Sequence, residues 1–125
     1  MKIEAGALAS VPEVFRKNFG EGPIIIVADG NTFEVAGREV QRELEEAGFA
    51  MMEPYVFPAD PPLYAEYSNI EKLRDSLREH YAIPVAVGSG TLNDIVKRSS
   101  HECERPYMCV GTAASMDGYT ALGLP

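Results

Sequence analysis

The sequence has no run of about 18 consecutive apolar residues, the length that a membrane-spanning helix requires. Its first residues, Met1 to Ala5, lack the basic and apolar regions of a secretory signal peptide. These absences argue against secretion and against a membrane partner. We therefore expect a soluble, cytoplasmic protein.

Positive charge is scarce in this chain. Lys and Arg number 11 while Asp and Glu number 19, so the formal net charge at pH 7 is −8. Such a chain repels a phosphate backbone, and nucleic acid is therefore not an expected partner. A small anionic ligand would have to be held by local backbone N–H groups, because the overall field repels it.

Cysteine is also scarce. Cys103 and Cys109 are separated by five residues, a spacing that matches no common zinc motif. A chain of 125 residues with 46% hydrophobic residues can fold without metal or disulfide support. We expect reduced thiols, one of them in a strand, and one domain over residues 1–125.

The order of apolar patterns predicts the fold class. Short apolar runs alternate with helical periods, which is typical of an α/β protein with an open parallel sheet and helices on both faces. The strands are expected at 23–28, 49–57, 83–87 and 106–110, and the helices at 7–19, 31–48, from 63 or 68 to 81, and from 91 onward.

Helix starts and inward faces follow from the same patterns. Asn31 with Glu34, and Ser68 with Glu71, have the spacing of capping boxes. The inward residues of the three helices that follow the first strand are expected to be Val35, Val40 and Leu44; Ile70, Leu73, Leu77 and Tyr81; and Leu92, Ile95 and Val96.

A small-residue loop between the strand at 83–87 and the next helix is the first candidate site. Gly88 and Gly90 would permit unusual backbone angles and close approach of a phosphate to the helix N-terminus. Ser89 and Thr91 could add hydroxyl donors. By spacing alone, a plain tight turn fits the loop equally well, since it is neither a G-x-G-x-x-G fingerprint nor a Walker loop.

A second polar segment, residues 111–120, follows the strand at 106–110. The carboxyl ends of parallel strands lie at one edge of a sheet, where open α/β sheets bind ligands. The two segments together therefore favour a ligand site more than either does alone. Taken alone, Asp117 could equally be a helix cap.

These segments carry a resemblance to a known family. The runs VGSGTLNDIVKRSS, RPYMCVGTAASMDGYTA and IIIVADGNTFEVAG resemble the glycerol-1-phosphate dehydrogenase branch of the iron-containing alcohol dehydrogenase and dehydroquinate synthase superfamily. The resemblance spans essentially the whole chain. It implies the Rossmann-like N-terminal nucleotide domain of an NAD- or NADP-dependent polyol dehydrogenase.

The resemblance also implies roles for individual residues. Asp29 would bind the adenosine ribose and favour NAD, while Asp117 would contact the hydroxyls of a polyol or glycerol phosphate substrate. The residues expected on the pyrophosphate side are Gly88, Ser89, Gly90, Thr91, Asn93 and Asp94, and those at the nicotinamide end are Thr112 and Ser115.

The chain departs from the family pattern in three ways. Gly111 and Ala114 replace prolines, and Ala121 replaces a serine. Family members also continue into a helical domain whose aspartate and two histidines hold a divalent metal, which is zinc, iron or nickel. We expect His80 and His101 to be helix surface residues rather than metal ligands. The expectation is a fragment that binds the nucleotide and is inactive without the metal domain.

Two other functions remain open at this point. Residues 88–94 resemble the loop of lipid and NAD kinases, although Ser89 stands where that loop has aspartate. A non-catalytic interaction domain on the same scaffold is the other alternative. In that case exposed Met116, Leu122 and Leu124 would favour self-association into a homo-oligomer.

Overall fold

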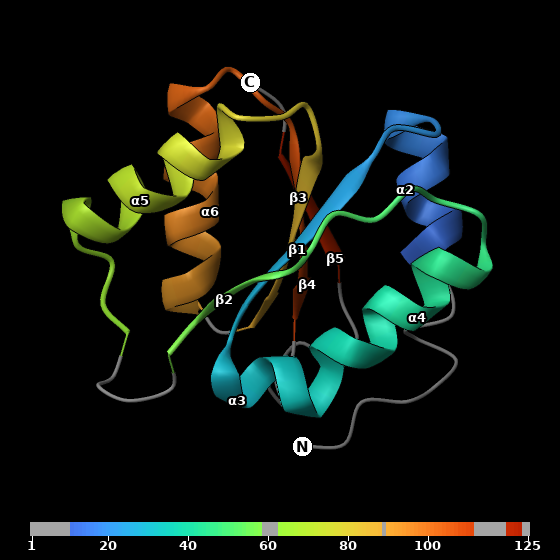
Figure 1. Cartoon of the computed structure of the whole chain (residues 1–125), viewed down its shortest axis with the longest axis horizontal. Coiled ribbons are helices and arrows are strands. Elements are labelled where there is room, and N and C mark those ends of the chain that lie inside the picture. The colour runs from blue at the N-terminus through green and yellow to red at the C-terminus, as the bar shows by residue number, and fades with distance from the viewer. Residues whose placement is uncertain (1–10, 59–62, 89, 112–119, 124–125) are drawn as a thin grey trace.

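The computed structural model describes residues 11–58, 63–88, 90–111 and 120–123. Helices and strands alternate along these residues (Figure 1). In chain order they are α2 (Val11–Phe19), β1 (Ile24–Asp29), α3 (Gly30–Thr32), the π-helical turn η1 (Phe33–Gly37), α4 (Arg38–Glu46), β2 (Tyr55–Phe57), α5 (Tyr67–Leu77), β3 (Ile83–Gly88), α6 (Gly90–Glu102), β4 (Tyr107–Gly111) and β5 (Thr120–Gly123).

The strands of the described residues form one sheet in the order β2-β1-β3-β4-β5. The first four are parallel, which confirms the predicted α/β class, and β5 runs antiparallel to β4. No pattern in the sequence predicted β5. The residues between β4 and β5 are too few for the dozen or so that a parallel crossover needs, so the chain returns antiparallel.

Two hydrophobic cores lie on opposite faces of the sheet. Ile24 and Ile26 of β1 point toward α2 and α4, whereas Ile25 and Val27 point toward α5 and α6. Figure 1 shows these two helix pairs on either side of the sheet. In the described residues no helix is long and apolar enough to span a bilayer.

The segment after β1 differs from its prediction. Asp29, not Asn31, caps the helix, and Val35 is 66% exposed while Val40 and Leu44 are buried as predicted. The cause is the π-helical turn, in which the Arg38 N–H donates to the Phe33 carbonyl, five residues back. An apolar face predicted with regular α-helical spacing across this wider turn therefore places Val35 on the wrong side of the helix.

The second strand and the following helix are shorter than predicted. Met51 forms an isolated parallel bridge with Ile24, and regular pairing resumes at Tyr55 after Pro54, which has no N–H to donate. Helix α5 begins after Glu66, so Ser68 does not cap it. Because α5 ends at Leu77, Tyr81 lies beyond the helix and is 89% exposed.

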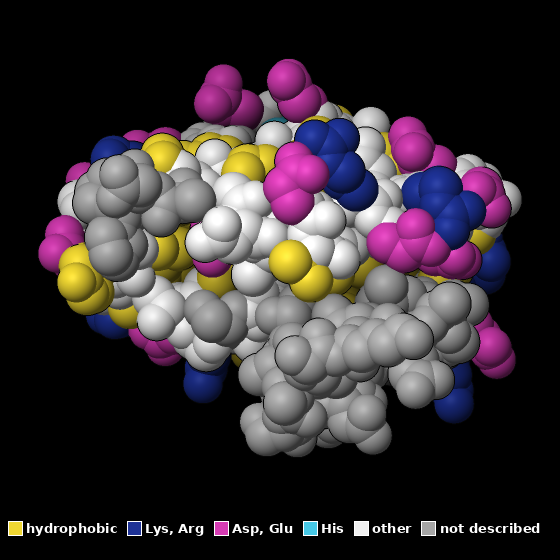
Figure 2. Space-filling view, turned by 90° about the horizontal axis from the view of Figure 1, so that it is seen from below, with side chains coloured by type: hydrophobic (Ala, Val, Ile, Leu, Met, Phe, Trp, Pro, Cys, Tyr) yellow, Lys and Arg dark blue, Asp and Glu magenta, His cyan; other side chains and the backbone are white. Residues whose placement is uncertain are grey.

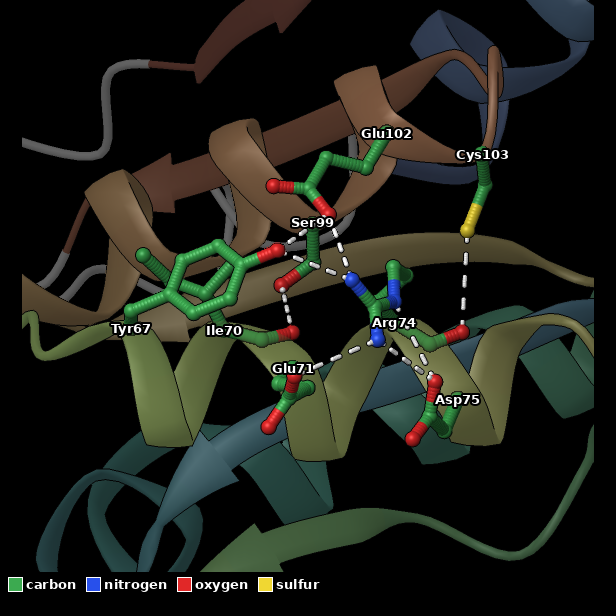
Figure 3. A network of polar contacts seen from close by, with 8 residues as sticks. All are labelled: Tyr67, Ile70, Glu71, Arg74, Asp75, Ser99, Glu102 and Cys103. Atoms are coloured by element: carbon green, nitrogen blue, oxygen red, sulfur yellow. Dashed lines mark hydrogen bonds and ion pairs between the residues drawn. The ribbon is translucent and has the colours of Figure 1, made fainter.

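A polar network joins α5 to α6 (Figure 3). The Arg74 guanidinium donates to Glu102 Oε1 at 2.8 Å and to the Tyr67 hydroxyl at 3.0 Å. Nearby, the buried Ser99 hydroxyl donates to the Ile70 carbonyl at 2.9 Å. These bonds fix the position of α6, the helix that follows the candidate glycine loop.

Arg105, just after α6, secures the C-terminal end of α5. Its guanidinium donates to the Leu77 and His80 carbonyl oxygens at 2.7 and 2.8 Å, and to that of Ala82 at 3.2 Å. Carbonyl groups at the C-terminal end of a helix lack intrahelical donors, and the Arg105 side chain supplies donors at the end of α5.

Replacing Arg105 with Ala should lower the free energy of unfolding by about 2 kcal/mol, because part-buried carbonyl oxygens lose a charged donor. Urea denaturation measures the change. Arg98→Ala is the matched control, since Arg98 is exposed and pairs with Asp94 at 3.8 Å. The control should lose less than about 0.5 kcal/mol. Equal losses in the two variants would contradict this role of Arg105.

Candidate functional site

The candidate site lies where the strand order reverses. The chain leaves β1 through α3 and α4 toward β2, and leaves β3 through α6 toward β4. Because α4 and α6 pack on opposite faces, the two connections diverge at the carboxyl ends of β1 and β3. In open α/β sheets this divergence creates the crevice in which ligands bind.

Asp29 lies at the carboxyl end of β1, where the two connections diverge. Its Oδ1 accepts a hydrogen bond from the Thr32 N–H at 2.8 Å, and its own N–H donates to Thr32 Oγ1 at 3.1 Å. Together these bonds form a reciprocal capping box. Within the described part of the chain, Oδ2 of Asp29 accepts no hydrogen bond, so one carboxylate oxygen is left for a ligand donor.

Gly88 brings the two strand ends into contact. A Cβ at this position would lie 2.6 Å from Leu92 Cδ2 and 3.3 Å from Thr32 Oγ1. Any side chain there would push against both α6 and the segment after β1. Gly88 also pairs with Gly111, which places the end of β4 at the same edge.

Gly90 has the opposite surroundings. It is the first residue of α6, and a Cβ added to it would meet no described atom within 4 Å. Neither Gly88 nor Gly90 has a positive φ, a conformation that Gly20 and Gly48 adopt among the described glycines. The two glycines instead give close packing at 88 and open space at 90.

The first turns of α6 line a small cavity. It has a volume of about 260 Å³ and is lined by Gly90, Asn93, Asp94, Lys97, Tyr107 and Cys109. Asn93 Oδ1 is buried and has no partner among the described residues, so it is available to a donor. The structure thus brings three predicted residues together and adds Lys97, a cation that the sequence analysis missed. Thr91 is half-buried in the same turn.

Four predicted residues, Ser89, Thr112, Ser115 and Asp117, lie outside the described residues, as do Met116 and Leu124. Their roles stay predictions. The structure does place Gly111, the residue that precedes Thr112, Ser115 and Asp117 in the chain. Gly111 lies at the end of β4, beside Gly88.

Charges around the crevice are of both signs. Figure 2 looks from below onto the end of the molecule where α3 lies, and acidic and basic side chains are interspersed on that face. Along α4, Arg42 pairs with Glu46 at 2.7 Å, and Arg38 pairs with Glu34 at 2.8 Å. These exposed pairs are the solvated face of a helix rather than a ligand site.

The histidines and cysteines form no metal-ligand cluster with other described residues. The described residues contain no group of three or more His, Cys, Asp or Glu that could hold a metal ion. Cys103 and Cys109 are free thiols, and Cys109 lies in β4 as predicted. Burial raises the pKa of the Cys109 thiol to about 11, so the thiol stays protonated at neutral pH.

His101 is exposed on α6 as predicted, but the prediction for His80 is wrong. His80 lies in the turn after α5, where its Nδ1 accepts from the Ala82 N–H at 3.1 Å and its Nε2 is buried. Burial, with a smaller effect of Arg105, lowers the pKa of His80. The neutral ring therefore has a structural role in this turn.

Comparison with known proteins gives a consistent family match. A family model described as iron-containing alcohol dehydrogenase matches residues 2–125. A glycerol-1-phosphate dehydrogenase (NAD(P)+) of Bacillus subtilis is 30% identical over 104 residues, which cover 82% of this chain and 26% of the relative. One from Methanosarcina mazei is 33% identical over 114 residues, covering 90% and 30%. The chain thus spans less than a third of these relatives.

Solved structures of the same kind share the fold. Glycerol dehydrogenase from Schizosaccharomyces pombe matches with a TM-score of 0.66 at 16% identity, covering 89% of this chain and 27% of that one. Iron-containing alcohol dehydrogenase from Thermococcus thioreducens matches with a TM-score of 0.63 at 22% identity, covering 82% and 26%. At these identities the likeness supports the fold alone.

Gly88→Ala should destabilise the domain by about 1–2 kcal/mol, because the new methyl group overlaps fully buried Leu92. Gly90→Ala, with open space around it, should change the free energy of unfolding by less than about 0.5 kcal/mol. Urea unfolding of both variants measures the difference. If both substitutions had the same effect, close packing at Gly88 would not be what holds the two strand ends together.

Proposed function

The chain belongs to the iron-containing alcohol dehydrogenase family, and from this premise we propose that residues 1–125 form the NAD(P)-binding domain of a polyol dehydrogenase. The substrate of the longer protein would be glycerol 1-phosphate, the compound named in its curated relatives. The observation that carries the proposal is the space around Gly90, which no described atom fills, at the N-terminus of α6 and beside the point where β1 and β3 diverge.

The pyrophosphate would lie over the start of α6. This helix is 13 residues long and has no acidic side chain in its first turn. Its first backbone N–H groups and the positive end of its dipole attract phosphate oxygens. Gly90 lets the phosphate approach that backbone, and Gly88, Ser89, Thr91, Asn93 and Asp94 would complete this part of the site.

The adenosine half would extend toward β2. Asp29 Oδ2, which accepts no hydrogen bond from the described residues, suits a ribose hydroxyl, and the negative charge of Asp29 would repel the 2′-phosphate of NADP. Asp29 is in register with Phe57 of β2, and Phe57 lines a cavity of about 470 Å³ together with Tyr55, Leu63, Asn69 and Lys72. Its aromatic and apolar walls fit a flat base.

The nicotinamide half would extend the other way, toward the end of β4. Thr112 and Ser115 would flank the ring, and Asp117 would accept hydrogen bonds from substrate hydroxyls. Bound nicotinamide supplies the acceptor for the hydride that leaves the secondary alcohol. The role of this domain is to hold cofactor and substrate at the correct distance and orientation.

The divalent metal of the family does not fit the described residues, which offer no cluster of ligands for it. We propose that its ligands belong to the remaining length of the longer protein. Without a Lewis acid to polarise the hydroxyl, the 125-residue chain alone should bind the dinucleotide and show no dehydrogenase turnover.

Calorimetric titration of the chain with NADH, NADPH and ATP tests the proposal. NADH should bind, and Gly90→Val should abolish that binding without unfolding the domain, since the new side chain occupies the open space at the start of α6. Gly22→Val is the matched control, because Gly22 lies before β1 at the opposite edge, with its nearest contact at 3.8 Å.

The other outcomes favour the alternatives. Binding of ATP in place of NADH would favour the kinase-like function. A folded chain that binds none of the three nucleotides, and that self-associates, would favour an interaction domain.

A further inference from the structure

Thr32 lies between the end of β1 and the end of β3, although no pattern in the sequence points to it. On one side its hydroxyl oxygen accepts from the Asp29 N–H at 3.1 Å. On the other side the same oxygen lies 3.3 Å from the place that a Gly88 Cβ would occupy. One hydroxyl group is therefore packed between the end of β1 and the end of β3.

The contact with Asp29 restricts the carboxylate. Oδ1 is held by the Thr32 N–H at 2.8 Å, and the backbone of Asp29 is held by the Thr32 hydroxyl. A carboxylate free to change rotamer could turn away from an approaching phosphate at a cost of about 1 kcal/mol. An aspartate held at both Oδ1 and its backbone N–H cannot turn away from that phosphate so easily.

From this geometry, and resting on the proposed function, we propose that Thr32 is a positioning residue that sets the preference for NAD over NADP. It acts through Asp29, which it holds in the orientation that accepts a ribose hydroxyl and repels a 2′-phosphate. Through its packing against Gly88 it also fixes the separation between the ribose site and the phosphate loop.

The test compares Thr32→Val and Thr32→Ser in the full 125-residue chain. Valine keeps the shape of threonine but cannot accept from the Asp29 N–H, whereas serine keeps the hydroxyl. Dissociation constants for NADH and NADPH are measured by calorimetry. In Thr32→Val the preference for NADH over NADPH should fall about tenfold, because the Asp29 backbone loses the hydrogen bond that helps to hold its carboxylate in place.

Serine should restore the preference to within about twofold of the original chain, since the hydroxyl and its hydrogen bond return. Ser99→Ala is the control, because it removes a buried hydroxyl bond between α5 and α6 and should lower stability without changing the preference. If Thr32→Val does not fold, Thr32→Ala removes the hydroxyl without adding a methyl group beside Gly88 and gives the same readout.

An unchanged preference for NADH in a folded variant without the hydroxyl would overturn the inference. An equal loss of affinity for NADH and NADPH would also overturn it. Failure of Thr32→Ser to restore the preference would also overturn it. If the original chain binds neither cofactor, both the proposed function and this inference are wrong. That result is distinct from an unchanged preference in a variant that binds both cofactors, which contradicts this inference alone.

Discussion

The close approach of three segments at Gly88 is the constraint on which the rest of this fold depends. The end of β3, the first turns of α6 and the segment after β1 meet there, with Leu92 and Thr32 in the space that a side chain would fill. Because residue 88 has no side chain, α6 can pack against β3 and β1 on one face of the sheet. The connection from β1 to β2, which contains α4, runs over the opposite face. The divergence of these connections makes the crevice, so the packing of one glycine and the position of the candidate site have the same cause.

The sequence predicted correctly the strands that are buried on both faces of the sheet. It failed where the backbone departs from a regular helix or strand. Residues 83–87 and 106–110 are apolar on both faces, and a central parallel strand must be so. The inward residues of α6 were correct because nothing interrupts that helix. Val35 was assigned to the wrong side because a π-helical turn is not visible in an apolar pattern. The broken start of β2 and the return of β5 depend on pairing partners that a single strand pattern does not contain.

Several candidate site residues were predicted from the sequence, whereas Thr32 and Lys97, which lie beside them, were not. Gly90, Asn93 and Asp94 line one cavity, as their shared loop and helix suggested. The sequence does not point to Thr32 because Asn31 and Glu34 have the spacing of a competing capping box. The spacing from Asp29 to Thr32 is itself that of a capping box, so a search beginning at the last strand residue could have found it. Lys97 carries no such signal, since a lysine on a helix is most often solvated.

A net charge of −8 and an anionic dinucleotide are compatible because their interaction is decided at short range. Exposed Glu34 and Glu46 pair with Arg38 and Arg42, and salt screens their field over distances of about 10 Å. The backbone N–H groups at the start of α6 would touch the phosphate directly, and no acidic side chain lies in that first turn. Placed at the diverging strand ends, Asp29 would then select among dinucleotides rather than repel all of them. Its carboxylate would meet a neutral hydroxyl in one cofactor and a phosphate in the other.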